Sequence, residues 1–504
     1  MQSPSEKRAG TDGKEGGRKR SDAEGPCQGK HAKPFTPQEA KDIVMTLQQP
    51  AVFYDMVSDW PARRWTVDHL SDVLNRKSIQ FRIGKKSHHT APQFETQCSY
   101  VQATLEQFIA WSYAQSPCSS GPFSSYDSSE YWAYADYKYM SILFEDHTEK
   151  LQDVMWSDFG FPGRNGREST LWIGTREANT PCHMDSYGCN LVMQVQGRKR
   201  WHLFPPEDGA FLYPTRIPYE ESSVFSQVNV VNPDLRCFPQ FRKAQTSVVT
   251  LHPGQVLFVP RHWWHYVESI DPITVSVNSW IELEEDHKAR VEEAITRLTV
   301  CAIKSAEDPC TAEVWLNPTE VDATSHDINL KYLHAAVAAY LKHQREAAIE
   351  PKQHRASSEQ DSFAQCKRMK MERSSNSSDC KPREHEPSLP MPKRKEKLPL
   401  SLHLVPVVPQ SERANCEGDK KGEGESGSSS HQVRKMEGER SEEFHSAWKE
   451  SVMNRNETLA EQALSGRSAC SPPKPISTND FLDCLVNPQV IHLVTRLLLE
   501  RQSS

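Results

Sequence analysis

Seven short apolar stretches follow one another between residues 170 and 283, with turn-forming Gly, Pro and Asp residues among them. In chain order they are LWIGTRE, NLVMQVQ, KRWHLFPP, TSVVTLH, QVLFVP, HYVESI and ITVSVNSWIEL. Short strands bounded by turn residues are typical of β-sandwiches and β-barrels, and helical periodicity is lost over the same region. The sequence therefore predicts a mainly β fold with flanking helices.

The chain before this region has two parts of different composition. Residues 1–33 are poor in apolar residues and rich in Gly, Lys and Glu, so they cannot offset the entropy of ordering. We predict a disordered leader there and a globular domain over residues 34–290. The first helix of the domain is expected after Thr36, a suitable N-cap, with Pro37 at its first position. A second helix is expected at 104–115, where the apolar residues share one face.

Helical periodicity returns after the β region. The stretches at 283–305 and 328–350 have apolar residues at helical spacing. We predict that the segment 291–350 packs either on the barrel or on a second copy of the chain in a homodimer. Residues 351–470, rich in Ser, Lys, Glu and Pro, are predicted to form a disordered linker. The final segment, 471–504, predicts two short amphipathic helices that dock on the barrel or bind another protein.

Charge and targeting signals limit the classes of partner and compartment. A net charge of −7 gives no general reason to expect nucleic acid or an anionic membrane as partner. No apolar run has the length of a membrane span, and the N-terminus lacks the apolar stretch of a signal peptide. We expect a cytoplasmic protein. The basic cluster at 392–397 is interpreted as a solvated tail or a nuclear-import signal, which makes the nucleus the second expected location.

The segment TPCHMDS, residues 180–186, holds a candidate metal site. His183 and Asp185 are two residues apart, so on a strand their side chains point to the same face. Two polar groups in a sheet interior cost several kcal/mol unless something binds them. A third ligand is available in His265, on a later strand. Two histidines and one carboxylate form the facial triad that binds Fe(II) and leaves coordination positions open.

Zinc binding and a different third ligand are the alternatives to iron at this segment. Zinc usually takes four ligands, often sulfur. Cys189 is close in sequence and Cys182 is closer still, but Cys182 is next to His183 and should point to the opposite face of the strand. His262 is a rival for the role of His265. A single buried histidine is more often a hydrogen-bonded core residue than a ligand. The place of His265 among aromatic residues on a later strand nevertheless favours a metal ligand.

Further polar residues are expected close to the triad. Lys199 opens the strand that returns after a turn at Gly197, and a lysine that enters a barrel can pair with a carboxylate. A solvated turn residue is an equally weighted interpretation, because the local GRKR run is basic. Thr180, Asn190 and Asn278 occupy strand positions from which they can hydrogen-bond within the site.

The order of these motifs resembles a known family. TPCHMD, N-x3-QVQGRKRW-x-LFPP, PGQVLFVPR-x-WWHYVES and TVSVNSW are similar to motifs of the JmjC (cupin-like) Fe(II)- and 2-oxoglutarate-dependent oxygenases. The likeness is to the small hydroxylase branch, which includes the asparaginyl hydroxylase of hypoxia-inducible factor. It covers residues 34–290 and implies a double-stranded β-helix, also called a jelly roll.

The resemblance also implies a site and a chemistry. It implies that iron is bound by His183, Asp185 and His265, with O2 and 2-oxoglutarate as co-substrates. Lys199 is then the partner of the distal carboxylate of 2-oxoglutarate. Thr180 and Tyr134 are implied to assist, and Asn190 and Asn278 to line the pocket.

The implied reaction is hydroxylation of a protein side chain, and the implied partner is a small heat-shock protein in the stress response. One departure concerns substrate choice, because Phe225 stands where the asparaginyl hydroxylase presents a glutamine to its substrate. A different side chain is therefore expected as substrate. The alternative function is an inactive JmjC scaffold that binds and regulates small heat-shock proteins. Lysine demethylation of chromatin is the weaker branch, since no histone-reading module accompanies the barrel.

Overall fold

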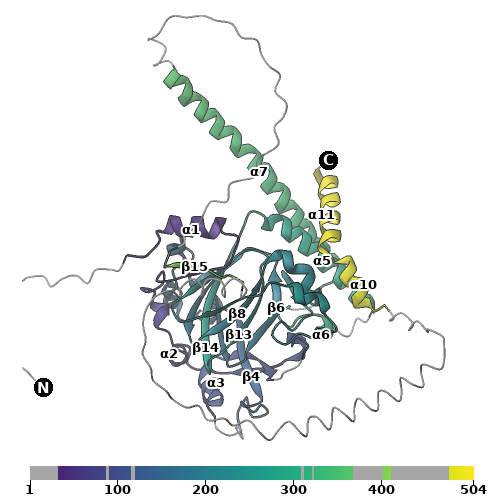
Figure 1. Cartoon of the computed structure of the whole chain (residues 1–504). Coiled ribbons are helices and arrows are strands. Elements are labelled where there is room, and N and C mark those ends of the chain that lie inside the picture. Colours follow the sequence, from purple (N-terminus) through teal and green to yellow (C-terminus); the bar gives the residue numbers. More distant parts are fainter. Residues whose placement is uncertain are drawn as a thin grey trace, which may run out of the picture.

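The structure is a computed structural model that describes residues 32–86, 90–114, 120–307, 312–320, 323–366, 401–409 and 476–503. Most of the predicted leader (1–33) and much of the predicted linker (351–470) lie outside these residues. The described chain forms two antiparallel β-sheets with helices around them (Figure 1). The mainly β fold predicted from the strand pattern is confirmed.

The two sheets differ in size, with strand orders β15-β1-β12-β7-β14-β5-β4-β2-β3 and β11-β8-β13-β6-β10-β9. The large sheet contains β1 (Ala51–Phe53), β2 (Ile79–Lys85), β3 (Ser99–Ala103), β4 (Tyr131–Tyr139), β5 (Thr170–Thr175), β7 (Cys189–Gln196), β12 (Val256–Val259), β14 (Ile273–Ile281) and β15 (Leu404–Pro406). The small sheet contains β6 (Asn179–Asp185), β8 (Lys199–Phe204), β9 (Pro214–Glu220), β10 (Ser223–Ser226), β11 (Ser247–Leu251) and β13 (Trp264–Ser269).

From β5 onward the chain passes back and forth between the sheets. Strands β5, β7, β12 and β14 lie in the large sheet, and β6, β8, β11 and β13 lie in the small one. This exchange of strands between two sheets is the arrangement of the double-stranded β-helix that the motifs predicted. Strands β9 and β10 are an insertion between β8 and β11, and they extend the small sheet beside β6.

Alternation along the central strands decides which groups face the space between the sheets. On β14, Val275 and Val277 belong to the main hydrophobic core, whereas Ser276 and Asn278 line a cavity between the sheets. On β7, Leu191 likewise faces the core. Because side chains alternate with a period of two, one face of each strand builds the core and the other supplies polar groups to the interior.

The helices in the described residues flank the sheets. They are α1 (Pro37–Thr46), α2 (Val67–Leu74), α3 (Leu105–Ser112), α4 (Met140–Leu143), α5 (Asp286–Glu307), α6 (Ala312–Trp315), α7 (His326–Cys366), α10 (Thr478–Leu485) and α11 (Pro488–Ser503). The predicted N-cap of α1 is confirmed, because the Thr36 side chain accepts a hydrogen bond from the backbone of Glu39 and the carboxylate of Glu39 accepts one in return.

The C-terminal helix pair docks on the folded domain. Helix α10 contacts β9 and α5, and α11 packs along α5 on the same side of the molecule (Figure 1). Leu482, Ile491 and Leu499 are buried there. In the described chain no single helix is both long and apolar enough to cross a membrane. Helices α10 and α11 reach that length and composition only as a pair, with a bend of 53° between them.

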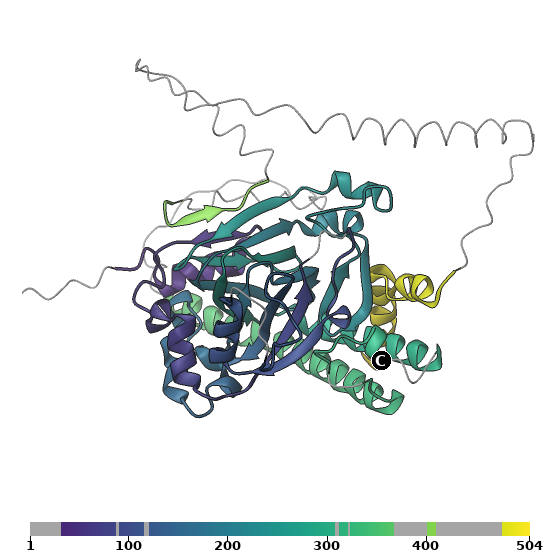
Figure 2. The ribbon, with the colours of Figure 1, turned by 90° about the horizontal axis from the view of Figure 1, so that it is seen from below.

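Residues 401–409 differ from the predicted disordered linker. They form β15, which pairs antiparallel with β1 at the edge of the large sheet (Figure 2). Leu404 and Val407 are buried against the domain. The average composition of the long segment obscured this local apolar run, LHLVPVV. Helix α7 also extends beyond residue 350, to Cys366.

Candidate active site

The three predicted metal ligands meet in space. His183 and Asp185 lie on β6, and His265 lies on the neighbouring strand β13, directly opposite His183 in the strand register. Their ligand atoms are all within 4.8 Å of one another. Nε2 of His183 is 3.6 Å from Oδ1 of Asp185, and the two imidazole rings are 4.2 Å apart between centroids. This spacing allows one ion to contact all three side chains.

Hydrogen bonds orient the two imidazole rings. Nδ1 of His183 is 2.9 Å from the carbonyl oxygen of Pro181, and Nδ1 of His265 is 2.9 Å from that of Trp263. A carbonyl can only accept, so each Nδ1 carries the proton and each Nε2 keeps a free lone pair. Burial, followed by the neighbouring His265, lowers the pKa of His183 to about 4. The imidazole is therefore neutral at physiological pH, as a metal ligand must be.

The carboxylate of Asp185 is also held in place. Trp280, on β14, donates its indole N–H to Oδ2 of Asp185 at 3.0 Å. Oδ1 remains directed at His183. An outer hydrogen bond of this kind fixes a ligating carboxylate and is part of most metal sites.

The rival ligands lie elsewhere. His262 sits in the turn before β13, at a φ of 66°, and lines a separate cavity beside α5 and α11. Cys182 packs in an apolar cluster on the opposite face of β6, as alternation predicted. Cys189 belongs to the main core. None of the three joins the group formed by the triad, so the described residues offer no sulfur ligand to it.

Lys199 is buried inside the barrel, with 2% of its surface exposed. Its ammonium group donates to the hydroxyl oxygens of Tyr134 at 3.0 Å and Ser276 at 2.8 Å. No ion pair of Lys199 is present in the part of the chain that the structure describes. Burial lowers its pKa to about 7. A buried amine whose hydrogen-bond partners are both hydroxyl groups is suited to bind a carboxylate.

The remaining predicted residues surround the same small cavity, whose volume is about 40 Å³. Seven of the eight predicted site residues line it: Tyr134, Thr180, His183, Asn190, Lys199, His265 and Asn278. Asn278 donates to the side-chain oxygen of Asn190 at 2.9 Å and accepts from Trp172 at 2.8 Å. The cavity thus places the two histidines of the triad and the buried ammonium group around one space, while Asp185 lies just outside it.

Sequence reasoning missed three residues that hydrogen-bond to predicted residues of this site. Ser276 bonds Lys199, Trp172 bonds Asn278, and Trp280 bonds Asp185. The first could have been found, because Ser276 is two residues before Asn278 on the same strand and so shares its face. The indole contacts depend on strand pairings that the sequence does not show.

Phe225 lies beside the triad, as its alignment with the hydroxylase insertion predicted. It sits on β10, opposite His183 in the strand register. Its ring centroid is 6.1 Å from that of His183 and 5.6 Å from that of Phe94. The position therefore presents an aromatic wall rather than an amide to the space next to the ligands.

Comparison with known proteins agrees with this geometry. Residues 37–287 match the family model of a cupin-like domain. The chain is 55% identical to human HSPB1-associated protein 1 over 480 residues, which cover 94% of this chain and 96% of that protein. It is 50% identical to the zebrafish homologue over 471 residues (94% and 98%). Lysine-specific demethylase 8 of Xenopus tropicalis is 26% identical over 247 residues, about half of each chain (48% and 49%).

Proposed function

The chain belongs to the family of HSPB1-associated protein 1, and on that basis we propose that it is an Fe(II)- and 2-oxoglutarate-dependent oxygenase that hydroxylates a protein side chain. One observation carries the proposal. Two histidines of a His–Asp–His triad line the same cavity as a buried lysine that has no acidic partner among the described residues. The triad suits ferrous iron, and the lysine suits the dicarboxylate co-substrate.

The donor set fits the cofactor better than it fits zinc. Zinc sites with three protein ligands need a fourth position only for water, whereas a facial triad leaves room for a chelating co-substrate. When bound, iron and 2-oxoglutarate supply the oxidation of a C–H bond to C–OH by O2, with release of succinate and CO2.

The protein's own residues hold and shield the reactants. Lys199 and the hydroxyl of Tyr134 would bind the distal carboxylate of 2-oxoglutarate, with Thr180 beside them in the cavity. Trp172 and Trp280 line the cavity and keep water out. Such positioning and exclusion of water are the usual contributions of a protein to cofactor chemistry.

The test is succinate formation by the purified full-length chain with Fe(II), 2-oxoglutarate and O2. We expect slow turnover without added substrate, and its loss in His265→Ala. His262→Ala is a matched control, because this histidine lies three residues away and outside the triad. Equal turnover by the wild type and His265→Ala would contradict the proposal.

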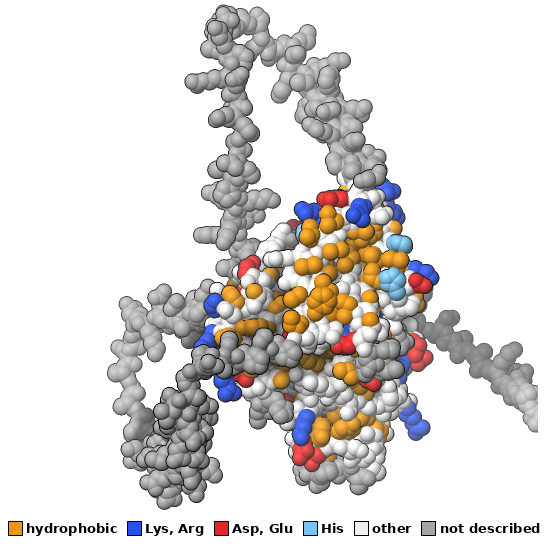
Figure 3. All heavy atoms as spheres, turned by 90° about the vertical axis from the view of Figure 1, so that its right-hand side faces the viewer, with side chains coloured by type: hydrophobic (Ala, Val, Ile, Leu, Met, Phe, Trp, Pro, Cys, Tyr) orange, Lys and Arg blue, Asp and Glu red, His pale blue; other side chains and the backbone are white. Residues whose placement is uncertain are grey.

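A second function, binding of a small heat-shock protein, is favoured by the names of the related proteins and by one surface. On α10 and α11, Phe481, Leu493 and Leu497 are each about half exposed. Figure 3, which views the side of the molecule that carries these helices, shows hydrophobic side chains gathered there. Exposed apolar patches commonly mark protein interfaces.

This second function is tested with the double variant Leu493→Asp and Leu497→Asp, in a binding assay with a purified small heat-shock protein. We expect loss of binding with unchanged metal content. The control is Ile142→Asp, an exposed apolar residue on α4. Wild-type binding by the double variant would exclude this surface.

A further inference from the structure

A large cleft adjoins the triad, and Lys199 is not among the residues that line it. Its volume is about 570 Å³, and Asp185 lines it. Tyr137 and Trp280 line both this cleft and the small cavity that holds the buried lysine. Because the two spaces share these walls and Asp185 lines the cleft, a molecule in the cleft lies beside the triad.

The lining of the cleft is strongly acidic. Its basic residues are Lys138 and Arg290, and Arg290 packs over the ring of Tyr187 at 4.8 Å. Its eight acidic residues are Glu95, Asp136, Asp185, Glu220, Glu221, Glu282, Asp286 and Glu320. Most of them already have a basic partner. Asp136 and Glu95 share Arg82. The other pairs are Glu282 with Arg164, Asp286 with Arg261, and Glu320 with Arg297.

Glu220 is the exception that matters for binding. It is 8% exposed, and its carboxylate accepts a hydrogen bond from the amide of Asn317, with no cationic partner in the described residues. The register across β6, β10 and β9 runs from Asp185 to Ser223 to Glu220. Two strand spacings therefore separate Glu220 from Asp185, about 10 Å between their backbones. A long side chain can span that separation.

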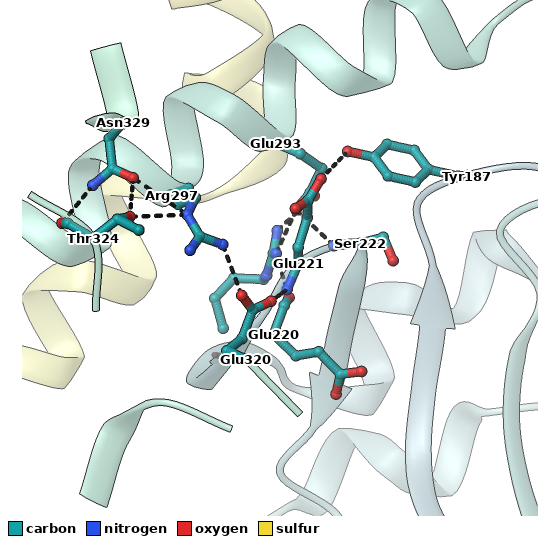
Figure 4. A network of polar contacts seen from close by, with 10 residues as sticks. Tyr187, Glu220, Glu221, Ser222, Glu293, Arg297, Glu320, Thr324 and Asn329 are labelled. Carbon is teal, nitrogen blue, oxygen red and sulfur yellow. Dashed lines mark hydrogen bonds and ion pairs between the residues drawn. The ribbon is translucent and has the colours of Figure 1, made fainter. Parts of the chain in front are cut away.

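The turn that presents Glu220 is fixed to helix α5 (Figure 4). Arg216 forms a two-pronged pair with Glu293 at 2.7 and 2.6 Å and donates to the carbonyl of Glu220 at 3.0 Å. The backbone N–H of Ser222 donates to Glu293 at 3.0 Å. The next carboxylate, Glu221, accepts from Tyr187 at 3.1 Å. Glu220 is thus positioned before any ligand arrives.

We propose that the side chain modified by this protein is cationic, a lysine or an arginine of a polypeptide, and that Glu220 binds its charged end in the cleft. This inference rests on the proposed oxygenase function and names its substrate class. A buried carboxylate that lacks a counter-ion is stabilised when a cation pairs with it. The aromatic walls at Tyr137 and Trp280 suit the aliphatic part of such a side chain and attract its charge.

Electrostatics supports the same assignment. Burial, and then the charge of Glu95, raises the pKa of Glu220 well above its ordinary value. A cation that enters the cleft favours the ionised carboxylate and offsets the cost of burying it. Acidic side chains would instead meet like charges. Neutral ones would form no ion pair with Glu220.

The test uses four pools of blocked nonapeptides with random flanking residues and a fixed central Lys, Arg, Asn or Asp. The full-length protein with Fe(II) and 2-oxoglutarate is assayed for succinate with and without each pool, and the products are checked for the gain of one oxygen atom. We expect the Lys or Arg pool to stimulate turnover roughly tenfold or more over the Asn pool, which is the scale of a charge-assisted hydrogen bond.

Glu220→Gln keeps the size of the side chain and removes its charge, so the ratio of stimulated to unstimulated turnover should fall by a similar factor. Glu106→Gln, on the exposed face of α3, is the control and should keep the ratio. Stimulation mainly by the Asn or Asp pool, stimulation by none, or an unchanged ratio in Glu220→Gln would overturn the inference. Absence of wild-type turnover without peptide would instead overturn the proposed function.

Discussion

The small cavity and the acidic cleft beside the triad are lined by different structural elements and by charged groups of opposite sign. The co-substrate cavity is walled mainly by strands of the barrel, and Lys199 is its buried cation. The acidic cleft is completed by the β9–β10 turn, by α5 and by the loop at residues 318–320. In the proposed function, the barrel supplies the site for an anion and the added segments supply the site for a cation. Substrate preference can change in the second part without altering the first.

The largest effect on the acidic cleft is expected from removing the ion pair that holds the β9–β10 turn. Arg216→Met leaves Glu293 charged and buried without its partner. Such a loss costs about 3–5 kcal/mol. We expect that decrease in the free energy of unfolding, measured by urea denaturation, together with loss of peptide stimulation.

Glu292→Gln is the control for that variant, because it changes the neighbouring, partly exposed glutamate of the same helix. An Arg216→Met protein as stable as the wild type would mean that α5 does not anchor the turn.

The variant Lys199→Met tests the small cavity inside the barrel. Removal of the buried ammonium should raise the KM for 2-oxoglutarate by about a hundredfold, the scale of losing one partner of a buried charge pair. Arg200→Met is the matched control, since Arg200 is the next residue on β8 and faces solvent. Equal KM values in Lys199→Met and the wild type would exclude Lys199 as the carboxylate partner.

The same lysine predicts a dependence of stability on pH. Its pKa is about 7 in the folded chain and should return to its ordinary value near 10.4 on unfolding. Between these values the unfolded state binds more protons, so its contribution to stability rises with pH, by on the order of 2 kcal/mol from pH 7 to 9. Urea denaturation without 2-oxoglutarate should show this rise in the wild type relative to Lys199→Met. If the free energy of unfolding changed equally with pH in the wild type and Lys199→Met, this prediction would be wrong.

The smallest expected effect concerns the wall that both spaces share. Trp280→Phe removes the hydrogen bond to Asp185 but keeps an aromatic ring. We expect about tenfold weaker Fe(II) binding in an anaerobic titration, as for other outer hydrogen bonds to metal ligands. Trp65→Phe removes a similar indole bond, to Asp153, and should leave the affinity unchanged. Unaltered affinity in Trp280→Phe would assign the indole a purely structural role.

The triad and the residues of the small cavity inside the barrel were predictable from the sequence for a physical reason. His183 and Asp185 share a strand face, and Asn278 lies on a strand whose alternation is visible in the sequence. The acidic cleft was not predictable in this way. Asp136 lies on β4 in the large sheet, Glu220 lies on β9 in the small sheet, and Glu95 lies outside both. These residues come together only through the packing of the two sheets, which no local pattern encodes.

Strand β15 has a consequence for the integrity of the large sheet. It hydrogen-bonds along β1, and the flanking bonds Tyr54 N–H to His403 O and Val407 N–H to Pro50 O extend the pairing beyond the strand itself. An uncovered sheet edge is a template for strand addition by other chains. Residues 401–409 therefore cover the edge of β1, and a chain cut before Ser401 would leave the backbone groups on that edge of β1 unpaired at the end of the sheet opposite β3.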